Sequence, residues 1–214
     1  IMDPLWAKGI VLENGDKRYV LCTLDWCGVG GSVYERFRKA IALAAGTDVR
    51  QVALHSVHQH AAPYLDGDGS TLLVRSHPKA LVASERWIAH IADRLTQAVQ
   101  EAASRLQPMN RIGIGRATVK QVASARRILH EGKHLTRWST GAKDPLLAQL
   151  PEGDIDTTLQ TISLAFNDRV LARLHFYTTH PQTFCCDGRA SADFVGAARE
   201  AKEKEEGIAQ IYFT

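Results

Sequence analysis

Histidines gathered at the end of one predicted strand are the residues of this sequence best suited to chemistry. His58 and His60 are separated by one residue, so in an extended chain both imidazoles point to one side, while His55 points to the other. Two imidazoles on one side can be aimed at a single metal ion or substrate, and zinc readily takes neutral imidazole nitrogen. The spacing alone is a weak signal, because a histidine is more often exposed or hydrogen-bonded than metal-bound.

His180 follows another predicted strand and precedes Pro181. Loops at the ends of strands are where α/β proteins place their functional residues. A pair formed by His58 and His180 would suit zinc, while exposed or hydrogen-bonded histidines are the alternative that the residues alone leave open. Four other histidines have no such context and are expected in loops or on the surface: His77, His90, His130 and His134.

Three charged residues have both a functional and a purely structural interpretation. Asp25 ends an apolar strand, where it can hold a site histidine or cap the next helix. Asp193 is either a carboxylate of the site or an acid stabilised by the dipole of a helix that begins there. Arg126, in a long predicted loop, is either a solvated charge or a clamp for an anion or a carbonyl oxygen. The residues alone leave these alternatives open.

The strands that must position these residues are predicted from apolar alternation and from turns. Asn14-Gly15 is a strong turn signal inside a hairpin over residues 9–25, because both residue types tolerate a positive φ angle. A turn at Asn167-Asp168 separates two arms with a period of two, over residues 162–176. Further strands are expected over residues 51–57, 111–119 and 208–213.

Helices are predicted where a capping residue precedes an apolar stripe of helical period. Ser32 and Glu35 have the spacing of a capping box, for a helix that ends at Gly46. Ser84 is expected to cap a second helix over residues 85–106.

A third helix is expected over residues 191–206, and residues 63–83 and 120–157 are expected to be mostly irregular. Strands therefore alternate with helices, and hairpins occur beside crossovers. This mixture predicts an α/β fold, with a mixed β-sheet that contains hairpins and with helices packed in layers.

The composition excludes several classes of protein. Apolar residues make up 45% and charged residues 23% of the 214 residues, which is typical of a globular chain. The net charge of +3 is too small and too dispersed to indicate a nucleic-acid partner. No apolar run approaches the roughly 18–20 residues of a membrane-spanning helix, so no transmembrane segment is predicted.

The four cysteines form no C-x-x-C pair, so they indicate neither a zinc ribbon nor a redox motif. A chain of this length can bury a core without disulfides. We expect four buried or half-buried thiols, with pairing of Cys22 and Cys27 across a strand end as the alternative.

Taken in order, five segments resemble the N-terminal catalytic domain of the neutral/alkaline, non-lysosomal ceramidase family. Residues 3–7, DPLWA, resemble the family's D-P-L-Y-A, and residues 56–63, SVHQHAAP, resemble its S-x-H-T-H-S-G-P motif. Ala125-Arg126 falls where the family carries Asn-Arg. Residues 179–183, THPQT, are similar to its H-P-T-S segment, and residues 191–196, SADFVG, to its S-[AS]-D-x-x-G. The match runs over nearly the whole chain.

The resemblance implies a zinc-dependent hydrolase of linear amides, in which zinc activates water for attack on an N-acyl lipid such as ceramide or on a related N-acyl compound. The family's zinc ligands fall on His58 and His180, and its substrate or transition-state contacts on His60 and Arg126. We predict Asp25 as a catalytic residue. We predict that Asp193 either supports the metal ligands or contacts the substrate. The implied partner is a small molecule or a lipid, the latter at a membrane surface, and not a nucleic acid.

Two departures from the family pattern leave the substrate open. Ala61-Ala62 replaces the Ser-Gly that follows the H-x-H motif, and Ala125 replaces the Asn before the arginine. A metal-dependent hydrolase of another ester or amide, such as a sugar or cell-wall amide, is therefore an alternative. A domain of the same fold that only binds a metal or a ligand is a second alternative.

The family also supplies a Glu and a Tyr ligand from further downstream, so we expect residues 1–214 to form a single, incomplete catalytic domain. The sequence assigns no compartment. The given residues include no signal peptide, but their start resembles a cut end, so secreted and periplasmic locations stay open.

Overall fold

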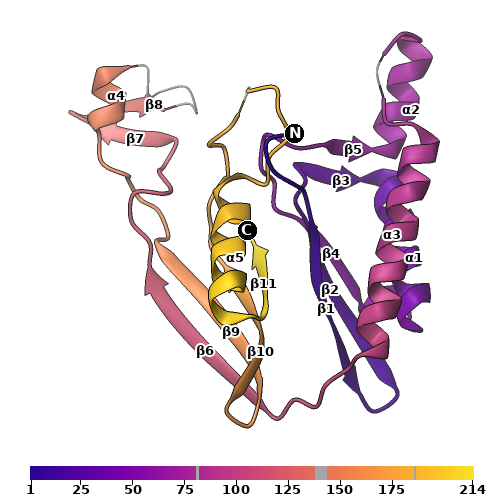
Figure 1. Cartoon of the computed structure of the whole chain (residues 1–214). Helices are drawn as coiled ribbons and strands as arrows, with labels where there is room; N and C mark the ends of the chain where they lie inside the picture. The colour runs from indigo at the N-terminus through magenta and orange to yellow at the C-terminus, as the bar shows by residue number, and fades with distance from the viewer. Residues whose placement is uncertain (81, 138–143, 186) are drawn as a thin grey trace.

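The computed structural model describes residues 1–80, 82–137, 144–185 and 187–214. Its helices and strands form the predicted α/β arrangement, with mixed sheets, hairpins and helices packed in layers (Figure 1). The strands are distributed over a three-stranded sheet, a four-stranded sheet and two short pairs, where the sequence suggested one mixed sheet. None of the helices in these ranges is long and apolar enough to cross a membrane.

The three-stranded sheet contains the first predicted hairpin. Strands β1 (Ala7–Asn14) and β2 (Lys17–Leu24) are antiparallel, and β4 (Val52–Ser56) runs parallel to β2. The turn consists of Gly15 and Asp16, one residue later than predicted, and Gly15 takes the positive φ angle of 62°. Because β2 and β4 are parallel, the loops that follow them leave from the same end of the sheet.

Helices α1 (Gly31–Ala45) and α3 (Glu85–Ser104) pack against each other and cover this sheet on its outer side (Figure 1). Their apolar stripes join β2 and β4 in the main hydrophobic core, through Val33, Phe37, Ile41, Ala92, Leu95 and Val99. The Ser84 hydroxyl caps α3 as predicted, and Gly46 ends α1 with a left-handed φ of 64°. The predicted capping box at Ser32 is wrong, because α1 already begins at Gly31 and has no side-chain cap.

The segment over residues 63–83 is more regular than predicted. Strand β5 (Tyr64–Asp66) pairs in parallel with β3 (Gly28–Gly30), and helix α2 (Gly67–Ser76) follows. The Asp66 carboxylate caps α2 by accepting from two backbone N–H groups of the first turn. Gly28 lets the strands approach, since a Cβ atom there would lie 2.6 Å from the ring of Tyr64.

The four-stranded sheet has the order β11-β10-β9-β6 and confirms the predicted second hairpin. Strand β9 (Thr158–Phe166) is antiparallel to both β10 (Arg169–Phe176) and β6 (Arg111–Thr118). Strand β11 (Ala209–Phe213) runs parallel to β10 and packs against β1 and β2. The carboxyl ends of β10 and β11 therefore lie together, as do those of β2 and β4.

Residues 120–157 contain short elements where the sequence suggested mostly irregular chain. They are the hairpin of β7 (Arg127–His130) and β8 (Lys133–Thr136), and helix α4 (Pro145–Gln149). The hairpin turn is Glu131-Gly132, with φ angles of 48° and 73°.

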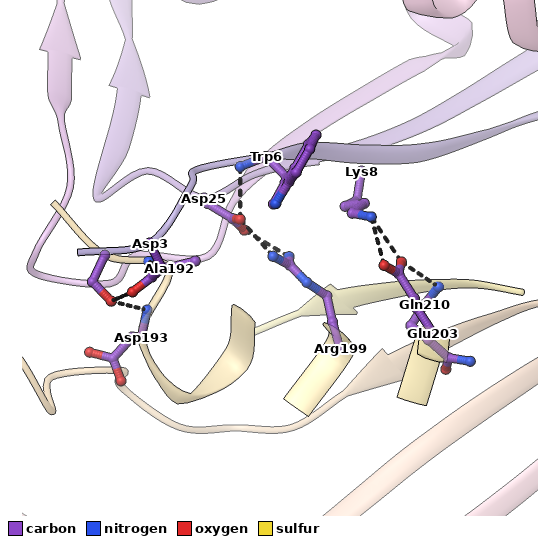
Figure 2. Close-up of polar contacts among 10 residues, drawn as sticks. Asp3, Trp6, Lys8, Asp25, Ala192, Asp193, Arg199, Glu203 and Gln210 are labelled. Carbon is purple, nitrogen blue, oxygen red and sulfur yellow. Dashed lines mark hydrogen bonds and ion pairs between the residues drawn. The ribbon is translucent and has the colours of Figure 1, made fainter. Parts of the chain in front are cut away.

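Helix α5 (Asp193–Glu206) lies between the two larger sheets and contacts both of them (Figure 1). It packs on β11, while Lys8 of β1 donates to both carboxylate oxygens of Glu203 at 2.9 Å (Figure 2). The same Glu203 accepts the backbone N–H of Gln210 in β11 at 3.2 Å. One acidic side chain of α5 thus contacts a strand of each sheet.

Candidate metal and active site

The histidines and one cysteine meet at the carboxyl ends of two pairs of parallel strands, β2 with β4 and β10 with β11. Cys27 follows β2, His58 and His60 follow β4, and His180 follows β10. The ends of parallel strands are where open α/β sheets form their sites, because successive loops converge there. Here the loops come from two different sheets.

Backbone hydrogen bonds fix these loops against one another. The His58 N–H donates to the carbonyl of Trp26 at 2.9 Å, which extends the contact between β2 and β4 beyond the strands. The His60 N–H donates to the carbonyl of Pro181 at 3.2 Å, which joins the loop after β4 to the loop after β10. The relative positions of His60 and His180 are therefore set by the main chain and not by their side chains alone.

His58 has a backbone conformation that is uncommon for a residue with a side chain. Its φ angle is 61°, in the left-handed region, which costs on the order of 1–3 kcal/mol and is concentrated at functional sites. Its Nδ1 lies 2.6 Å from the carbonyl oxygen of Cys27. A carbonyl oxygen only accepts, so Nδ1 carries the proton and Nε2 keeps its lone pair free for a ligand.

The rings of His58, His60 and His180 form one cluster. Their centroids are 5.1 Å apart for His58 and His60, 4.8 Å for His58 and His180, and 4.5 Å for His60 and His180. The Nε2 atoms of His60 and His180 lie 2.6 Å apart, so one of these rings donates to the other. Residues 120 positions apart in the sequence thus direct nitrogen atoms at the same point.

Cys27 joins this cluster, which the sequence did not predict. Its Sγ, a ring nitrogen of His58 and a ring nitrogen of His60 all lie within 4.8 Å of one another. The signal available in the sequence was its position two residues after Asp25, following the strand β2 that pairs with β4, and β4 leads to His58. Burial raises the pKa of the Cys27 thiol above its ordinary value.

A donor set of imidazole nitrogens and one thiol fits zinc, which favours nitrogen and sulfur ligands in a tetrahedral arrangement. Cys27 itself is a free thiol, as is Cys22, so the alternative pairing of Cys22 with Cys27 is wrong. Cys186 lies outside the described residues.

The electrostatic environment keeps two of the histidines neutral. Partial burial lowers the pKa of His60, and electrostatic effects of the neighbouring His58 and Arg126 lower it further, while Asp193 acts in the opposite direction. Burial also lowers the pKa of His180, with additional effects of His60, His58 and Arg126. Neutral imidazole is the form that binds a metal or accepts a proton. Arg126 and Asp193 are thus within electrostatic reach of the cluster, as a functional role requires.

Asp193 lies at the start of a helix and also close enough to His60 to affect its pKa, which are the two environments considered for it from the sequence. It is the first residue of α5, with a φ angle of 58°, and its side chain is almost completely buried. Its carboxylate accepts the backbone N–H of Phe194 at 2.7 Å and that of Phe184 at 3.4 Å. The acid therefore stabilises the start of the helix and also contributes charge beside His60.

The turn that carries Asp193 is held by Asp3 from the beginning of the chain (Figure 2). The carboxylate of Asp3 accepts the hydroxyl of Ser191 and the backbone N–H of Ala192, both at 2.6 Å. The Ser191 hydroxyl in turn accepts the N–H of Asp193 at 3.0 Å. The segments DPLWA and SADFVG, which were singled out separately in the sequence, are hydrogen-bonded to each other.

Asp25 lies in a different environment from the two that were predicted for it. Its carboxylate forms two hydrogen bonds with the guanidinium of Arg199 in α5, at 2.7 and 2.6 Å, and accepts the Trp6 N–H at 2.9 Å (Figure 2). The residue that caps α1 is Gly30. A carboxylate that is fully buried needs an opposite charge, and Arg199 supplies it in place of a histidine or a helix end.

No family model and no curated protein sequence matches this chain. Solved structures do match. A ceramidase complexed with C2 has a TM-score of 0.68 and 19% identity, over 97% of this chain and 31% of that chain. Neutral ceramidase from Pseudomonas aeruginosa has a TM-score of 0.69 and 17% identity, over 97% of this chain and 32% of that chain. The chain has a ceramidase-like fold.

The ceramidase-like fold confirms what the sequence segments implied about architecture. The chain spans about one third of the length of the ceramidases that it matches. At 17–19% identity the likeness concerns the fold, so the chemistry must be argued from the residues of the site.

Proposed function

We propose that the protein is a metal-dependent hydrolase of ceramidase type, which cleaves the amide bond of an N-acyl lipid or of a related N-acyl compound. The observation that carries this proposal is the convergence of His58, His60 and His180 from two sheets of a ceramidase-like fold. Side chains rarely gather three imidazoles at the ends of parallel strands for packing alone, since each brings polar atoms that need partners.

In this proposal His58 and His180 hold zinc. The hydrogen bond between Nδ1 of His58 and the Cys27 carbonyl orients the ring and leaves Nε2 available, an arrangement typical of metal-binding histidines. When bound, zinc supplies Lewis acidity, which polarises a carbonyl oxygen and makes water more acidic.

His60 is the residue that moves a proton. Its lowered pKa keeps it neutral near pH 7, so it can accept a proton from the attacking water and pass it to the nitrogen of the leaving amine. Its main-chain hydrogen bond to Pro181 keeps it beside His180 while the proton is transferred.

Arg126 is the residue that binds the substrate carbonyl. It lies in the loop between β6 and β7, and its charge is felt by both His60 and His180. A guanidinium presents several donors in a fixed plane, which suits an oxygen that gains negative charge during the reaction. The negative charge of Asp193 opposes the effect of Arg126 on the pKa of His60.

The proposed chemistry defines the substrate class as N-acyl compounds, and it leaves the acyl chain and the amine portion unspecified. Ala61 is buried and Ala62 half-buried directly after His60, so this segment next to the cluster is more apolar than a Ser-Gly pair would make it. Ceramide-like lipids at a membrane surface and soluble N-acyl compounds are both included in the proposal.

Release of fatty acid from a panel of N-acyl substrates tests the proposal. The full-length protein is purified, treated with a chelator and then reloaded with zinc, beside the variants His58→Ala and His180→Ala. Activity should disappear with the chelator, return with zinc, and stay absent in both variants. His77→Ala changes an exposed histidine at the end of α2 and should behave like the unmodified protein. A zinc-loaded protein that cleaves no substrate of the panel would contradict the hydrolase.

A further inference from the structure

The position of Cys27 relative to the histidines has chemical consequences of its own. Its Sγ lies 3.9 Å from Nδ1 of His58, and it shares a group of donors within 4.8 Å with His58 and His60. In a tetrahedral zinc site, with Zn–N near 2.0–2.1 Å and Zn–S near 2.3 Å, donor atoms are about 3.3–3.6 Å apart. Small rotations of three side chains therefore bring this group to the spacing of a metal site.

We propose that Cys27 is a thiolate ligand of the metal that the histidines bind. This inference rests on the proposed function, since it concerns the same metal. On binding, the thiol releases its proton to the solvent and the Cys27 sulfur forms a bond to the cation. Cys27 would add a sulfur donor to the histidine nitrogens, and zinc takes both kinds of ligand.

The main chain around Cys27 is built to hold the thiol in this place. The Cys27 N–H donates to the carbonyl of Pro63 at 2.8 Å, and the Cys27 carbonyl receives Nδ1 of His58 at 2.6 Å. One residue thus orients a histidine ligand through its carbonyl group and presents a sulfur atom through its side chain. The Cys27 side chain is partly exposed, so a metal ion can reach it.

The same geometry argues against Cys27 as a nucleophile activated by His58. A base must accept the thiol proton, but Nδ1 of His58 is already protonated and directed at the Cys27 carbonyl oxygen. The distance from Nδ1 to Sγ, 3.9 Å, is also longer than that to the carbonyl oxygen, 2.6 Å.

A sulfur ligand changes which metal the site selects. Thiolate favours zinc and other borderline or soft cations over magnesium and calcium, which prefer oxygen. It also neutralises part of the cation's charge. We therefore expect zinc to bind in the presence of excess magnesium, and cobalt, which replaces zinc in such sites, to report the sulfur spectroscopically.

X-ray absorption at the zinc edge tests the inference without requiring activity. The zinc-loaded protein should show one sulfur atom at about 2.3 Å from the metal, besides nitrogen. The cobalt-loaded protein should show a sulfur-to-cobalt charge-transfer band in the near ultraviolet. Cys27→Ser should lose both signals and bind zinc at least about 10-fold more weakly, because loss of an outer partner alone already costs 10–100-fold. Cys22→Ala, at a buried free thiol within β2, is the control and should retain both signals.

Two results would overturn the inference, and they are distinguishable. If zinc binds with only nitrogen and oxygen around it, and Cys27→Ser retains the affinity, Cys27 is not a ligand while the proposed function stands. If the unmodified protein binds neither zinc nor cobalt, the metal itself is absent and the proposed function fails too. The absorption measurement on the unmodified protein does not depend on whether the variant folds.

Discussion

Asp25 and Arg199 form an ion pair with both side chains buried, at 0% and 3% exposure, and with two hydrogen bonds of 2.7 and 2.6 Å between carboxylate and guanidinium. The pair joins the end of β2 to the middle of α5. Because Cys27 follows Asp25 by two residues and Asp193 begins the helix of Arg199, the pair fixes the distance between two parts of the site.

Asp25→Asn should destabilise the protein by about 3–5 kcal/mol, because it leaves the Arg199 cation buried without a counter-charge. Chemical denaturation gives the free energy of unfolding. Asp48→Asn is the control, since Asp48 pairs with Arg50 at the surface, where solvent screens the interaction, and its loss should be much smaller. Adding Arg199→Met to Asp25→Asn should recover part of the loss. Equal effects of the two aspartate variants would show that the buried pair is not important for stability.

The stability of the metal-free protein should fall as the pH decreases from 7.5 through about 6.5, the ordinary pKa of histidine. The pKa values of His60 and His180 are lowered in the folded protein, mainly by burial and then by neighbouring positive charge. Below the unfolded-state pKa the unfolded chain binds protons that the folded site resists, so stability is present above it and is lost towards the folded-state values.

Denaturation curves at a series of pH values measure this dependence. In the double variant His60→Gln, His180→Gln the decrease between pH 7.5 and 5.5 should be smaller. His77→Gln, at an exposed position, should follow the unmodified protein. A decrease of the same size in the double variant would assign the pH dependence to other groups.

Gly196→Ala should destabilise the protein although alanine favours helix. On propensity alone, this change inside α5 would stabilise it by about 1 kcal/mol. A Cβ atom at Gly196, however, would collide with the Cβ of Ala192, in the turn that Asp3 holds. Unfolding free energies decide between the two effects. We expect a lower stability and weaker zinc binding, because the turn carries Asp193; a gain in stability would show that the turn moves without cost.

Two tyrosines with different hydroxyl environments offer a matched pair of variants. The Tyr212 hydroxyl donates to the carbonyl of Tyr177 at 3.0 Å, whereas the buried Tyr177 hydroxyl has no partner among the described residues. Tyr212→Phe should cost about 1 kcal/mol of unfolding free energy, and Tyr177→Phe should be neutral or stabilising. If Tyr177→Phe costs as much as Tyr212→Phe, the Tyr177 hydroxyl has a partner in solution.

The long helices and strands could be predicted from the sequence because the capping or turn residues and the spacing of apolar residues indicated the same element. Helix α3 has its cap at Ser84 and an apolar stripe that becomes buried, and the hairpin of β9 and β10 alternates on both arms. Helix α2 packs no apolar stripe into the core: Leu72 and Leu73 are exposed, and none of its residues is buried. Only the Asp66 cap could have indicated it.

The site was predictable in part for a physical reason. Histidines at strand ends could be located because a strand fixes where its last residues lie, and His58, His60 and His180 are indeed brought together. The partner of Asp25 could not be predicted, because Arg199 is 174 residues away and its burial depends on how α5 is placed between the sheets. For Cys27 the same applies, since its thiol meets the histidines only when β2 and β4 pair in their observed register.

The contact between His60 and His180 closes a loop of 120 residues. Closing a long loop costs entropy before any contact within it is rewarded, so contacts of this kind form late in folding. The histidine cluster should therefore be complete only when both sheets have assembled. A cation that needs all three imidazoles would bind tightly only after both sheets have assembled, so metal uptake measured over time during refolding would report when the site is complete.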